Sequence, residues 1–317
     1  MGSEMDRLAF LKVMGIGGAV FATGLPGFAE TFGPAGAAKA ADFYFVQLSD
    51  THWGFAGAKA NPDAKGTLGK AIDAVNALDP QPDFVIFTGD LTHITDDPQL
   101  RRQRLAEFKA QAARLRARQV RYIPGEHDAG GGDHGEAYRE AFGTSRYAFA
   151  HKGIHFIALD NVSQEGSILG DDQLKWFADE LSRTPKTEPL VIFAHRPLFD
   201  LYPDWDWTTT DGQKAIDLLK DHRFVTVFYG HIHQEHHHRT GHIQHHSATS
   251  LIFPLPAPGS VPKRAAVPWD PAHPYQGLGF RQVRTQPAQL KVGDGQGLLV
   301  VTEKPLAETL KAAEKPA

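Results

Sequence analysis

The amino-acid sequence predicts an α/β fold, and three observations lead to this prediction. Short apolar runs with the length of buried strands recur along the chain. Segments whose apolar residues repeat at helical spacing lie between them, as in sheets whose strands are joined through helices. Five of the runs end on a carboxylate or a histidine, which predicts a site, because ligands in open α/β sheets bind beyond the carboxyl ends of the strands.

The five strand-like runs carry polar residues directly after their last apolar positions. In chain order they are 43–49 followed by Asp50 and His52, 83–89 by Asp90, 120–125 by Glu126, His127 and Asp128, 189–194 by His195, and 225–230 by His231 and His233. Three of the runs end on a glycine, namely Gly89, Gly125 and Gly230. Glycine suits tight turns at which the backbone approaches an ion closely. Together these side chains supply enough ligands for two adjacent metal ions.

The spacing of residues within two of these groups predicts which side chains face the same side. In an extended chain, residues i and i+2 point to the same side. Asp50 and His52 are therefore expected to offer two ligand atoms to a common centre. The same alternation predicts that His231 and His233 also face one centre together.

Four segments between the runs have the apolar spacing of helices. Their diagnostic residues are Leu68, Ile72 and Val75 in the first, Leu105, Phe108, Ala112 and Leu115 in the second, Leu174, Phe177 and Leu181 in the third, and Ala215 and Leu218 in the fourth. The fourth begins at Thr210 and Asp211, residue types that cap helix N-termini. The second, within 101–118, is the most basic stretch of the chain, and we interpret it as a solvated helix face.

Composition limits the partners and ligands that the chain can use. The formal net charge is −4, without a clustered basic stripe, so no nucleic-acid binding surface is evident. There is no cysteine, which excludes disulfides and thiolate ligands. The five ligand segments cannot be divided between independent domains and no internal repeat is visible, so we predict one catalytic domain over 41–303.

The remaining segments of this domain are predicted from local patterns. Residues 151–160 have the pattern of a further strand, and the region after the fifth run has that of hairpins with a turn at 239–241. Residues 254–274 hold seven prolines, too many for a central strand, so we expect an extended loop that covers the sheet or rims the site. Closing strands are expected within 278–302, around a turn at 293–295.

The two ends of the chain are expected to lie outside the domain. Residues 1–40 resemble an export signal, with Arg7 and Lys12 beside a Gly- and Ala-rich apolar segment at 13–28 and an A-x-A-like cleavage site at 38–40. Residues 10–12 match the end of the twin-arginine consensus, but Leu8 replaces its second arginine. Export to the periplasm by Tat is one alternative, with Sec or a lipid-facing anchor as others, so membrane contact is expected only through an uncleaved leader. Residues 304–317 are expected to form a frayed helix or a loose tail.

The ordered set of motifs resembles a known family. Asp-x-His, Gly-Asp, Gly-x-His-Asp, His and Gly-His-x-His follow one another between residues 50 and 233, as in the calcineurin-like metallophosphoesterases. The resemblance implies the metallo-dependent phosphatase fold, a four-layer sandwich of two mixed β-sheets flanked by helices. It also implies two divalent or trivalent transition-metal ions, Mn, Fe or Zn, and the hydrolysis of small phosphate mono- or diesters by a metal-bound hydroxide.

The resemblance also implies roles for single residues. Asp50, His52 and His233 would hold the first metal, Asp90 would bridge, and Glu126, His195 and His231 would hold the second. His127 would lie beside the substrate phosphate as the proton donor or charge stabiliser. Asp128 either orients the imidazole of His127 or caps a turn.

Glu126 departs from the family pattern, which usually has asparagine at this position. A third carboxylate lowers the net positive charge of the centre by one unit, and an ionised glutamate can only accept hydrogen bonds. Both effects penalise a dianionic monoester more than a monoanionic diester, so we expect diester or nucleotide-type substrates to be favoured. The alternative function is a catalytically weak metal-binding or protein-interaction module on the same scaffold. His127 favours the enzyme, because a decayed site has no reason to keep its proton donor.

Two further groups of residues remain open from the sequence alone. Six of the 17 histidines lie within 236–246, directly after the last motif, where they either occupy the surface, support the ligands or assist metal loading. Trp205 and Trp207 follow His195 in an acidic loop. They either stack on a nucleobase or aromatic leaving group or pack onto the domain.

Overall fold

The computed structural model of the chain describes residues 43–130, 132–285 and 299–313. The export signal expected over 1–40 and the turn expected at 293–295 lie outside these residues. Within the described ranges, no helix has both the length and the apolar character needed to cross a membrane.

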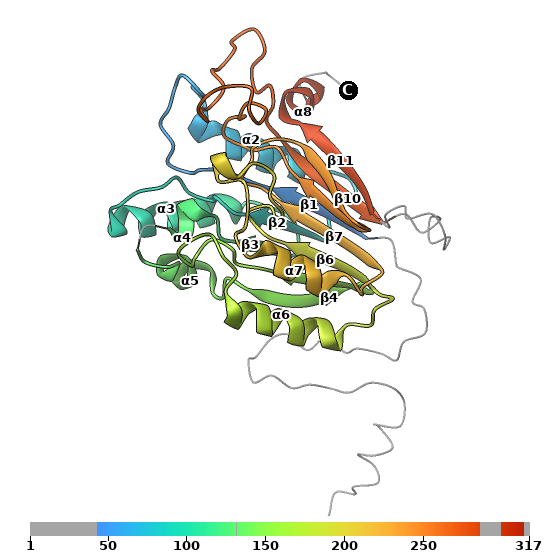
Figure 1. The fold of residues 1–317 in the computed structure, drawn as a ribbon. Helices are drawn as coiled ribbons and strands as arrows, with labels where there is room; N and C mark the ends of the chain where they lie inside the picture. The colour runs from blue at the N-terminus through green and yellow to red at the C-terminus, as the bar shows by residue number, and fades with distance from the viewer. Residues whose placement is uncertain (1–42, 131, 286–298, 314–317) are drawn as a thin grey trace, which may run out of the picture.

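Two mixed β-sheets form the centre of the fold (Figure 1). The first has the strand order β11 (Leu299–Pro305), β10 (Gly279–Thr285), β1 (Tyr44–Leu48), β2 (Phe84–Thr88) and β3 (Val120–Ile123). The second has the order β4 (Tyr147–His151), β5 (Ile154–Ala158), β6 (Pro189–Phe193), β7 (Phe224–Tyr229), β9 (Ile243–Ser247) and β8 (His236–Thr240). Strands β1 to β3 run parallel to one another, as do β5, β6, β7 and β9, whereas β10, β11, β4 and β8 pair antiparallel. All five predicted runs are thus strands.

Helices cover the outer face of each sheet, which confirms the predicted four-layer sandwich (Figure 1). Helices α2 (Ala64–Asn76), α3 (Pro98–Ala112) and α8 (Leu306–Ala313) pack on the first sheet. Helices α6 (Asp171–Arg183) and α7 (Gly212–Leu219) pack on the second. The short helices α4 (Glu126–Ala129) and α5 (Glu136–Phe142) follow β3, and a 3₁₀ turn, η1 (Pro203–Trp205), follows β6.

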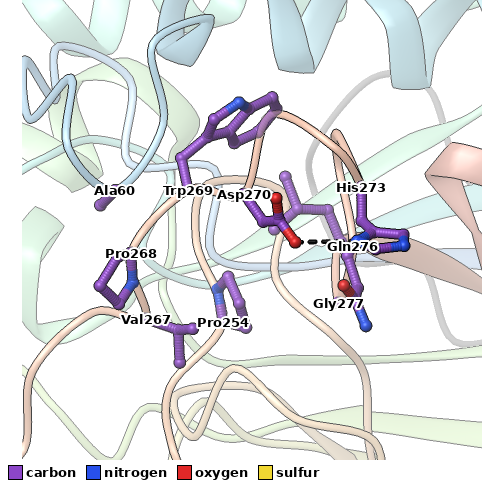
Figure 2. A pocket seen from close by; sticks show the side chains of 10 residues that line it. Ala60, Pro254, Val267, Pro268, Trp269, Asp270, His273, Gln276 and Gly277 are labelled. Carbon is purple, nitrogen blue, oxygen red and sulfur yellow. Dashed lines mark hydrogen bonds and ion pairs between the residues drawn. The ribbon is translucent and has the colours of Figure 1, made fainter.

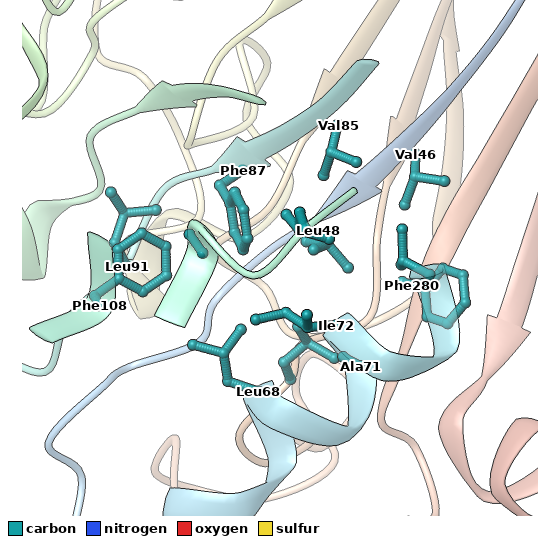
Figure 3. Close-up of a cluster of buried hydrophobic side chains, with 14 of the residues drawn as sticks. Val46, Leu48, Leu68, Ala71, Ile72, Val85, Phe87, Leu91, Phe108 and Phe280 are labelled. Atoms are coloured by element: carbon teal, nitrogen blue, oxygen red, sulfur yellow. The ribbon is translucent and has the colours of Figure 1, made fainter. Parts of the chain in front are cut away.

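Strand β1 is buried on both faces, which explains its continuous apolar run. Val46 and Leu48 face Leu68 and Ile72 of α2 in the outer layer (Figure 3). Phe45 points the other way, into the layer between the two sheets. This alternation follows from the period of two along a strand, and it ties β1 to both of its neighbouring layers.

Aromatic rings hold the two sheets together. Phe45 of the first sheet stacks on Phe84 with 5.1 Å between ring centres. It meets Phe193 and Phe228 of the second sheet edge to face, at 5.7 and 5.4 Å. Aromatic pairs in this geometry contribute about 1 kcal/mol each beyond the area that they bury. Because these pairs span the inter-sheet layer, they fix one sheet against the other.

Two predicted segments differ from the structure in a way that backbone geometry explains. The strand expected over 151–160 is present as β5, but it begins only at Ile154, because the chain reverses at Lys152 and Gly153, with φ of 48° and 79°, from the unpredicted strand β4. The C-terminal segment is a packed helix rather than a frayed one, because β11 continues to Pro305 and Leu306 is buried in the core of the first sheet.

The helices also differ from prediction at their ends. Helix α3 begins earlier than expected, at Pro98, because the Asp97 carboxylate accepts hydrogen bonds from the N–H groups of Gln99 and Leu100. Asp211 does not cap α7 with its side chain as expected. Its carboxylate accepts instead from the N–H groups of two residues before α6, and so links the starts of the two helices.

Candidate metal centre

The carboxyl ends of five strands bring the seven expected ligand residues together. They form two groups that share Asp90. The first contains Asp50, His52, Asp90 and His233, and the second contains Asp90, Glu126, His195 and His231. Within each group the potential ligand atoms all lie within 4.8 Å of one another. The sharing of Asp90 makes this a candidate dinuclear metal site.

The shared carboxylate lies between the two groups. Asp90 Oδ2 is 3.4 Å from His52 Nε2 and 3.5 Å from His195 Nε2. In the first group, His233 Nε2 is 3.4 Å from Asp50 Oδ1 and 3.2 Å from His52 Nε2. These distances suit ligand atoms that face common points rather than one another.

Backbone carbonyls fix the protonated nitrogen of three histidines. The Nδ1–H groups of His195 and His233 donate to the carbonyls of Thr88 and Phe253, both at 2.7 Å. The Nε2–H of His231 donates to the carbonyl of Asp206 at 2.9 Å. In each ring the other nitrogen faces the ligand group, where a histidine that binds a metal offers it unprotonated.

The ligand residues adopt a backbone conformation that the extended-chain prediction did not include. Positive φ angles, from 41° to 66°, occur at Asp50, His52, Asp90, His231 and His233. Each costs roughly 1 kcal/mol or more for a residue with a Cβ, a cost that is typical of functional sites. The prediction that His231 and His233 share one centre is therefore wrong, because they belong to different groups. Asp50 and His52 do share one, but through a left-handed turn rather than a strand.

Two glycines allow the strand ends to approach as closely as they do. A Cβ on Gly125 would lie 2.1 Å from the backbone nitrogen and Oδ1 of Asp90. A Cβ on Gly89, where φ is 95°, would lie 2.2 Å from His195 Nδ1. Both positions therefore exclude any side chain, and the close approach is to ligand residues of neighbouring strand ends.

Buried polar atoms without partners show that the second group fits a cation. Glu126 Oε2, His195 Nε2 and His231 Nδ1 are buried and make no hydrogen bond. His195 Nε2 and Glu126 Oε2 are nevertheless only 2.9 Å apart, and His231 Nδ1 is 2.8 Å from Glu126 Oε1. Leaving such atoms unsatisfied is costly, whereas a metal ion among them would satisfy all three. Carboxylate and imidazole donors together suit Mn, Fe or Zn.

Electrostatics keep the Glu126 carboxylate ionised. Burial raises the pKa of Glu126, but the positive potential of His231, Arg196 and His195 holds it well below its usual range. Burial lowers the pKa of His195, and Asp90 and Glu126 more than compensate, so it lies well above its ordinary value. Without a metal, a proton on His195 thus provides the positive charge that the carboxylates favour. Metal binding is therefore expected to release a proton.

His127 lies at the rim of the centre. Its Nδ1 accepts a hydrogen bond from the N–H of Ile94 at 3.0 Å, so the neutral ring carries its proton on Nε2. That Nε2 is 3.9 Å from Asp90 Oδ2, and the side chain is 21% exposed. A substrate can therefore reach the N–H.

The hydrogen bonds of Asp128 match one of its two predicted roles, the capping of a turn. Its carboxylate accepts from the N–H groups of Gly125, Leu91 and Thr92 and from the Thr92 hydroxyl, at 2.8–2.9 Å. It thus ties the turn after β2 to the turn after β3. These bonds involve both of its oxygens and none goes to the His127 ring, which favours the turn-capping alternative over orientation of His127.

Several residues of the site were missed from the sequence. Arg196, 4% exposed, lies 3.6 Å through its Nε from Glu126 Oε2. A charged residue so close to the end of an apolar, strand-like run is the sequence signal that could have identified Arg196. The loop after Arg196 contacts the site through the carbonyl of Asp206, which accepts from His231. Trp205 and Trp207 of this loop are buried with Tyr229, so the alternative that they pack onto the domain is confirmed.

The proline-rich segment begins beside the site, because the carbonyls of Leu255 and Pro256 accept from the side-chain amide of Gln234, the neighbour of His233. Phe253, the residue before this segment, contacts the ligand histidines directly. The carbonyl of Phe253 accepts from His233, and its ring lies 4.8 Å from that of His233 and 5.6 Å from that of His52. Directly after Phe253, a cavity of about 420 Å³ opens between Pro254, Ala60 and residues 267–278 (Figure 2). The loop therefore combines one aromatic contact to the centre with a separate hollow beside it.

Comparisons with known proteins agree with this geometry. The sequence profile described as calcineurin-like phosphoesterase matches residues 43–235. The serine/threonine-protein phosphatase CPPED1 of Mus musculus is 25% identical over 217 residues, which cover 61% of this chain and 70% of that protein. The probable cyclic nucleotide phosphodiesterase RPA0124 of Rhodopseudomonas palustris is 27% identical over 249 residues, 69% and 83% of the two chains. The crystal structure of a dimetal phosphatase from Danio rerio superposes with a TM-score of 0.56 at 13% identity, covering 82% of this chain and 98% of that one, and so shares the fold.

Proposed function

The chain belongs to the calcineurin-like phosphoesterase family of metal-dependent phosphoesterases, and on that premise we propose that it hydrolyses small phosphate mono- and diesters at a dinuclear centre, with diesters favoured. The observation that carries the proposal is the pair of four-residue ligand groups that share Asp90. Two transition-metal ions held there would lower the pKa of a bound water and neutralise the phosphoryl oxygens. No nucleophilic side chain is then required.

His127 supplies the proton in this scheme. Its Nε2–H faces the side of the centre on which Asp90 lies, and Ile94 holds the opposite nitrogen. A neutral imidazole with this tautomer can donate a hydrogen bond to the leaving oxygen and transfer its proton as the ester bond breaks.

Two features support diesters. Glu126 can only accept hydrogen bonds, so it offers no donor to the extra negative oxygen of a monoester. Apolar side chains also lie near the histidines at the rim of the centre, because Ile94, whose N–H bonds His127, is 46% exposed and the ring of Phe55 lies 5.1 Å from that of His93. A diester with organic groups on both sides of phosphorus suits this wall. The relatives include a protein named as a phosphatase and one named as a probable phosphodiesterase, which supports both classes of substrate.

Metal content and a substrate panel test the proposal. Purified protein incubated with Mn, Fe or Zn should hold about two ions per chain by elemental analysis, and it should hydrolyse p-nitrophenyl phosphate and, with a higher kcat/KM, bis-p-nitrophenyl phosphate. A protein with metal but no turnover on either ester would support a metal-binding or interaction module instead. A protein that stays near zero metal would contradict the dinuclear centre.

The role of Glu126 has its own test. Glu126→Asn adds one unit of positive charge to the centre and restores a hydrogen-bond donor. The ratio of kcat/KM for monoester to that for diester should rise by about tenfold, since the attraction scales with substrate charge. An unchanged ratio, with metal content intact, would exclude Glu126 as the cause of the preference.

Export to the periplasm is the remaining part of the proposal. It rests on the sequence of residues 1–40, and the cleavage site at 38–40 predicts a mature chain that starts near Ala41. N-terminal sequencing of protein from separated cell fractions should find this shortened form in the periplasm. Full-length protein confined to the cytoplasm would contradict it.

A further inference from the structure

Arg196 is a buried arginine beside the second ligand group, and the scheme above does not use it. It follows His195 at the carboxyl end of β6. Its Nη1 donates to the carbonyl of Asp206 at 2.9 Å and lies 2.6 Å from Oδ2 of the same residue. Its Nε is buried, makes no hydrogen bond and lies 3.6 Å from Glu126 Oε2. A guanidinium stays charged in proteins, so this position brings a fixed positive charge to the edge of the centre.

The carboxylates of the two groups differ in their surroundings. Asp50 contacts the imidazole of His233, and Asp90 contacts those of His52 and His195. Glu126 contacts imidazoles as well, but it also faces the guanidinium of Arg196. The charge of Glu126 is therefore offset by a permanent cation that is not itself a metal ligand.

A single carbonyl connects Arg196 to the second group. The Asp206 oxygen accepts both from Arg196 Nη1 and from His231 Nε2–H. Glu126 closes the ring, because it lies 2.8 Å from His231 Nδ1. Arg196, Glu126 and His231 thus form one connected unit.

We propose that Arg196 is a specificity-determining residue, whose charge offsets part of the charge of Glu126 and thereby preserves hydrolysis of dianionic monoesters. The inference rests on the proposed function. Coulomb attraction scales with the charge of the substrate, so loss of a cation beside the centre weakens binding of a dianion more than that of a monoanion. Arg196 is not among the potential ligands, whereas Glu126 is, so the offset is partial, which agrees with a preference for diesters.

A charge cycle tests this proposal in the metal-loaded protein. The variants are Arg196→Met, Glu126→Asn, the double variant and Arg196→Lys, each with its metal content measured. Arg196→Met should lower kcat/KM for the monoester about tenfold more than for the diester. The double variant has the net charge of the wild type and should return the ratio to within about threefold of it, and Arg196→Lys should retain most of the ratio.

Arg264→Met is the matched control for the loop. Arg264 donates to the carbonyl of Trp205 at 2.7 Å, so it holds the same segment as Arg196 without contacting a ligand residue. It should leave the ratio of the two substrates unchanged. Equal losses on both substrates in Arg196→Met, or a double variant that keeps the ratio of Arg196→Met, would show that Arg196 only holds the fold and would overturn the proposal.

A metal-free measurement separates failure of this inference from failure of the proposed function. In metal-free protein, Arg196→Met removes the permanent cation beside Glu126, whose Oε2 is buried, and should lower the urea midpoint of unfolding. The same change in the Glu126→Asn background should lower it far less, so the two effects are not additive. Additive effects would overturn the pairing even in an active enzyme. If the wild type hydrolyses neither ester, the proposed function fails while this cycle still reports on the pair.

Discussion

The histidines of the metal centre and those of the hairpin β8–β9 follow one another in the sequence, yet their rings are held in different ways. In the centre, His195, His231 and His233 each donate one ring N–H to a backbone carbonyl and turn the other nitrogen towards carboxylates. In the hairpin, His245 is buried with neither nitrogen hydrogen-bonded and packs against Phe199 at 5.0 Å. Anchoring of one nitrogen and convergence of the other with carboxylates therefore distinguish a ligand, whereas histidine density does not.

The exposed face of the hairpin supports the same distinction. His237 and His246 are opposite each other on the paired strands, with 2.6 Å between their Nδ1 atoms. The Nε2 of His237 contacts Glu235 at 3.0 Å, so the available carboxylate is on the far side of the ring. Throughout the described ranges, groups of three or more potential ligands occur only at the centre and its neighbour His93.

Removing one histidine from each ligand group should give the largest effect. His195→Ala and His233→Ala should each reduce the metal content from two ions to about one, because each ring belongs to only one group. Turnover should fall by at least about 10⁴-fold, since the activation of water depends on both ions. Elemental analysis and assays under saturating substrate would measure both quantities.

His245→Leu is the control for this experiment. It removes a histidine of similar burial from the neighbouring hairpin and should leave two ions and nearly full activity. Loss of an ion in that variant, or retention of both in His195→Ala, would remove the distinction between the two sets of histidines.

His127 sharpens the comparison, because it lies at the centre without belonging to either ligand group. His127→Ala should lower turnover by about 10²–10⁴ while the metal content stays at two. His93→Ala is the matched control, since its ring lies 5.1 Å from that of His127 and should affect turnover far less. If His127→Ala also loses metal, the residue is a ligand or a structural contact rather than the proton donor.

The sequence predicted the strands and the set of converging residues, because both depend on local patterns. A continuous apolar run predicts a strand buried on both faces, and the order of strand ends predicts convergence at one edge of the sheets. The turn conformation was not predictable, because left-handed φ at Asp50 and His231 is enforced by tertiary contacts. The Oδ atoms of Asp50, for example, accept from the N–H of His231 at 3.1 Å.

The residues missed from the sequence depend on contacts between distant segments. The role of Arg196 depends on its contacts with Glu126 and Asp206. The role of Phe253 depends on its contacts with His233 and His52. Asp128 could not be assigned because its partners are backbone N–H groups of the turn after β2, whose position no side-chain pattern encodes. Local patterns therefore identify candidate ligands, while the groups that orient them appear only in three dimensions.

The smallest effect is expected on the stability of the hairpin, where His245 titrates with folding. Burial, followed by His238 and His236, lowers the pKa of His245 from 6.5 to about 3. The unfolded chain therefore binds a proton that the folded chain does not, so stability is complete above pH 6.5 and is lost as the pH falls towards 3. This loss is roughly 3 kcal/mol in the free energy of unfolding between pH 7 and pH 4.

Urea unfolding of metal-free protein should show a shallower pH dependence for His245→Leu than for wild type. Ile243→Val, a buried change on the same strand without a titrating group, should lower stability by the same amount at each pH. If the free energy of unfolding has the same pH dependence in His245→Leu and wild type, the His245 ring is solvated or hydrogen-bonded in solution. The contrast between this buried, unbonded ring and the anchored rings of the ligand histidines would then fail.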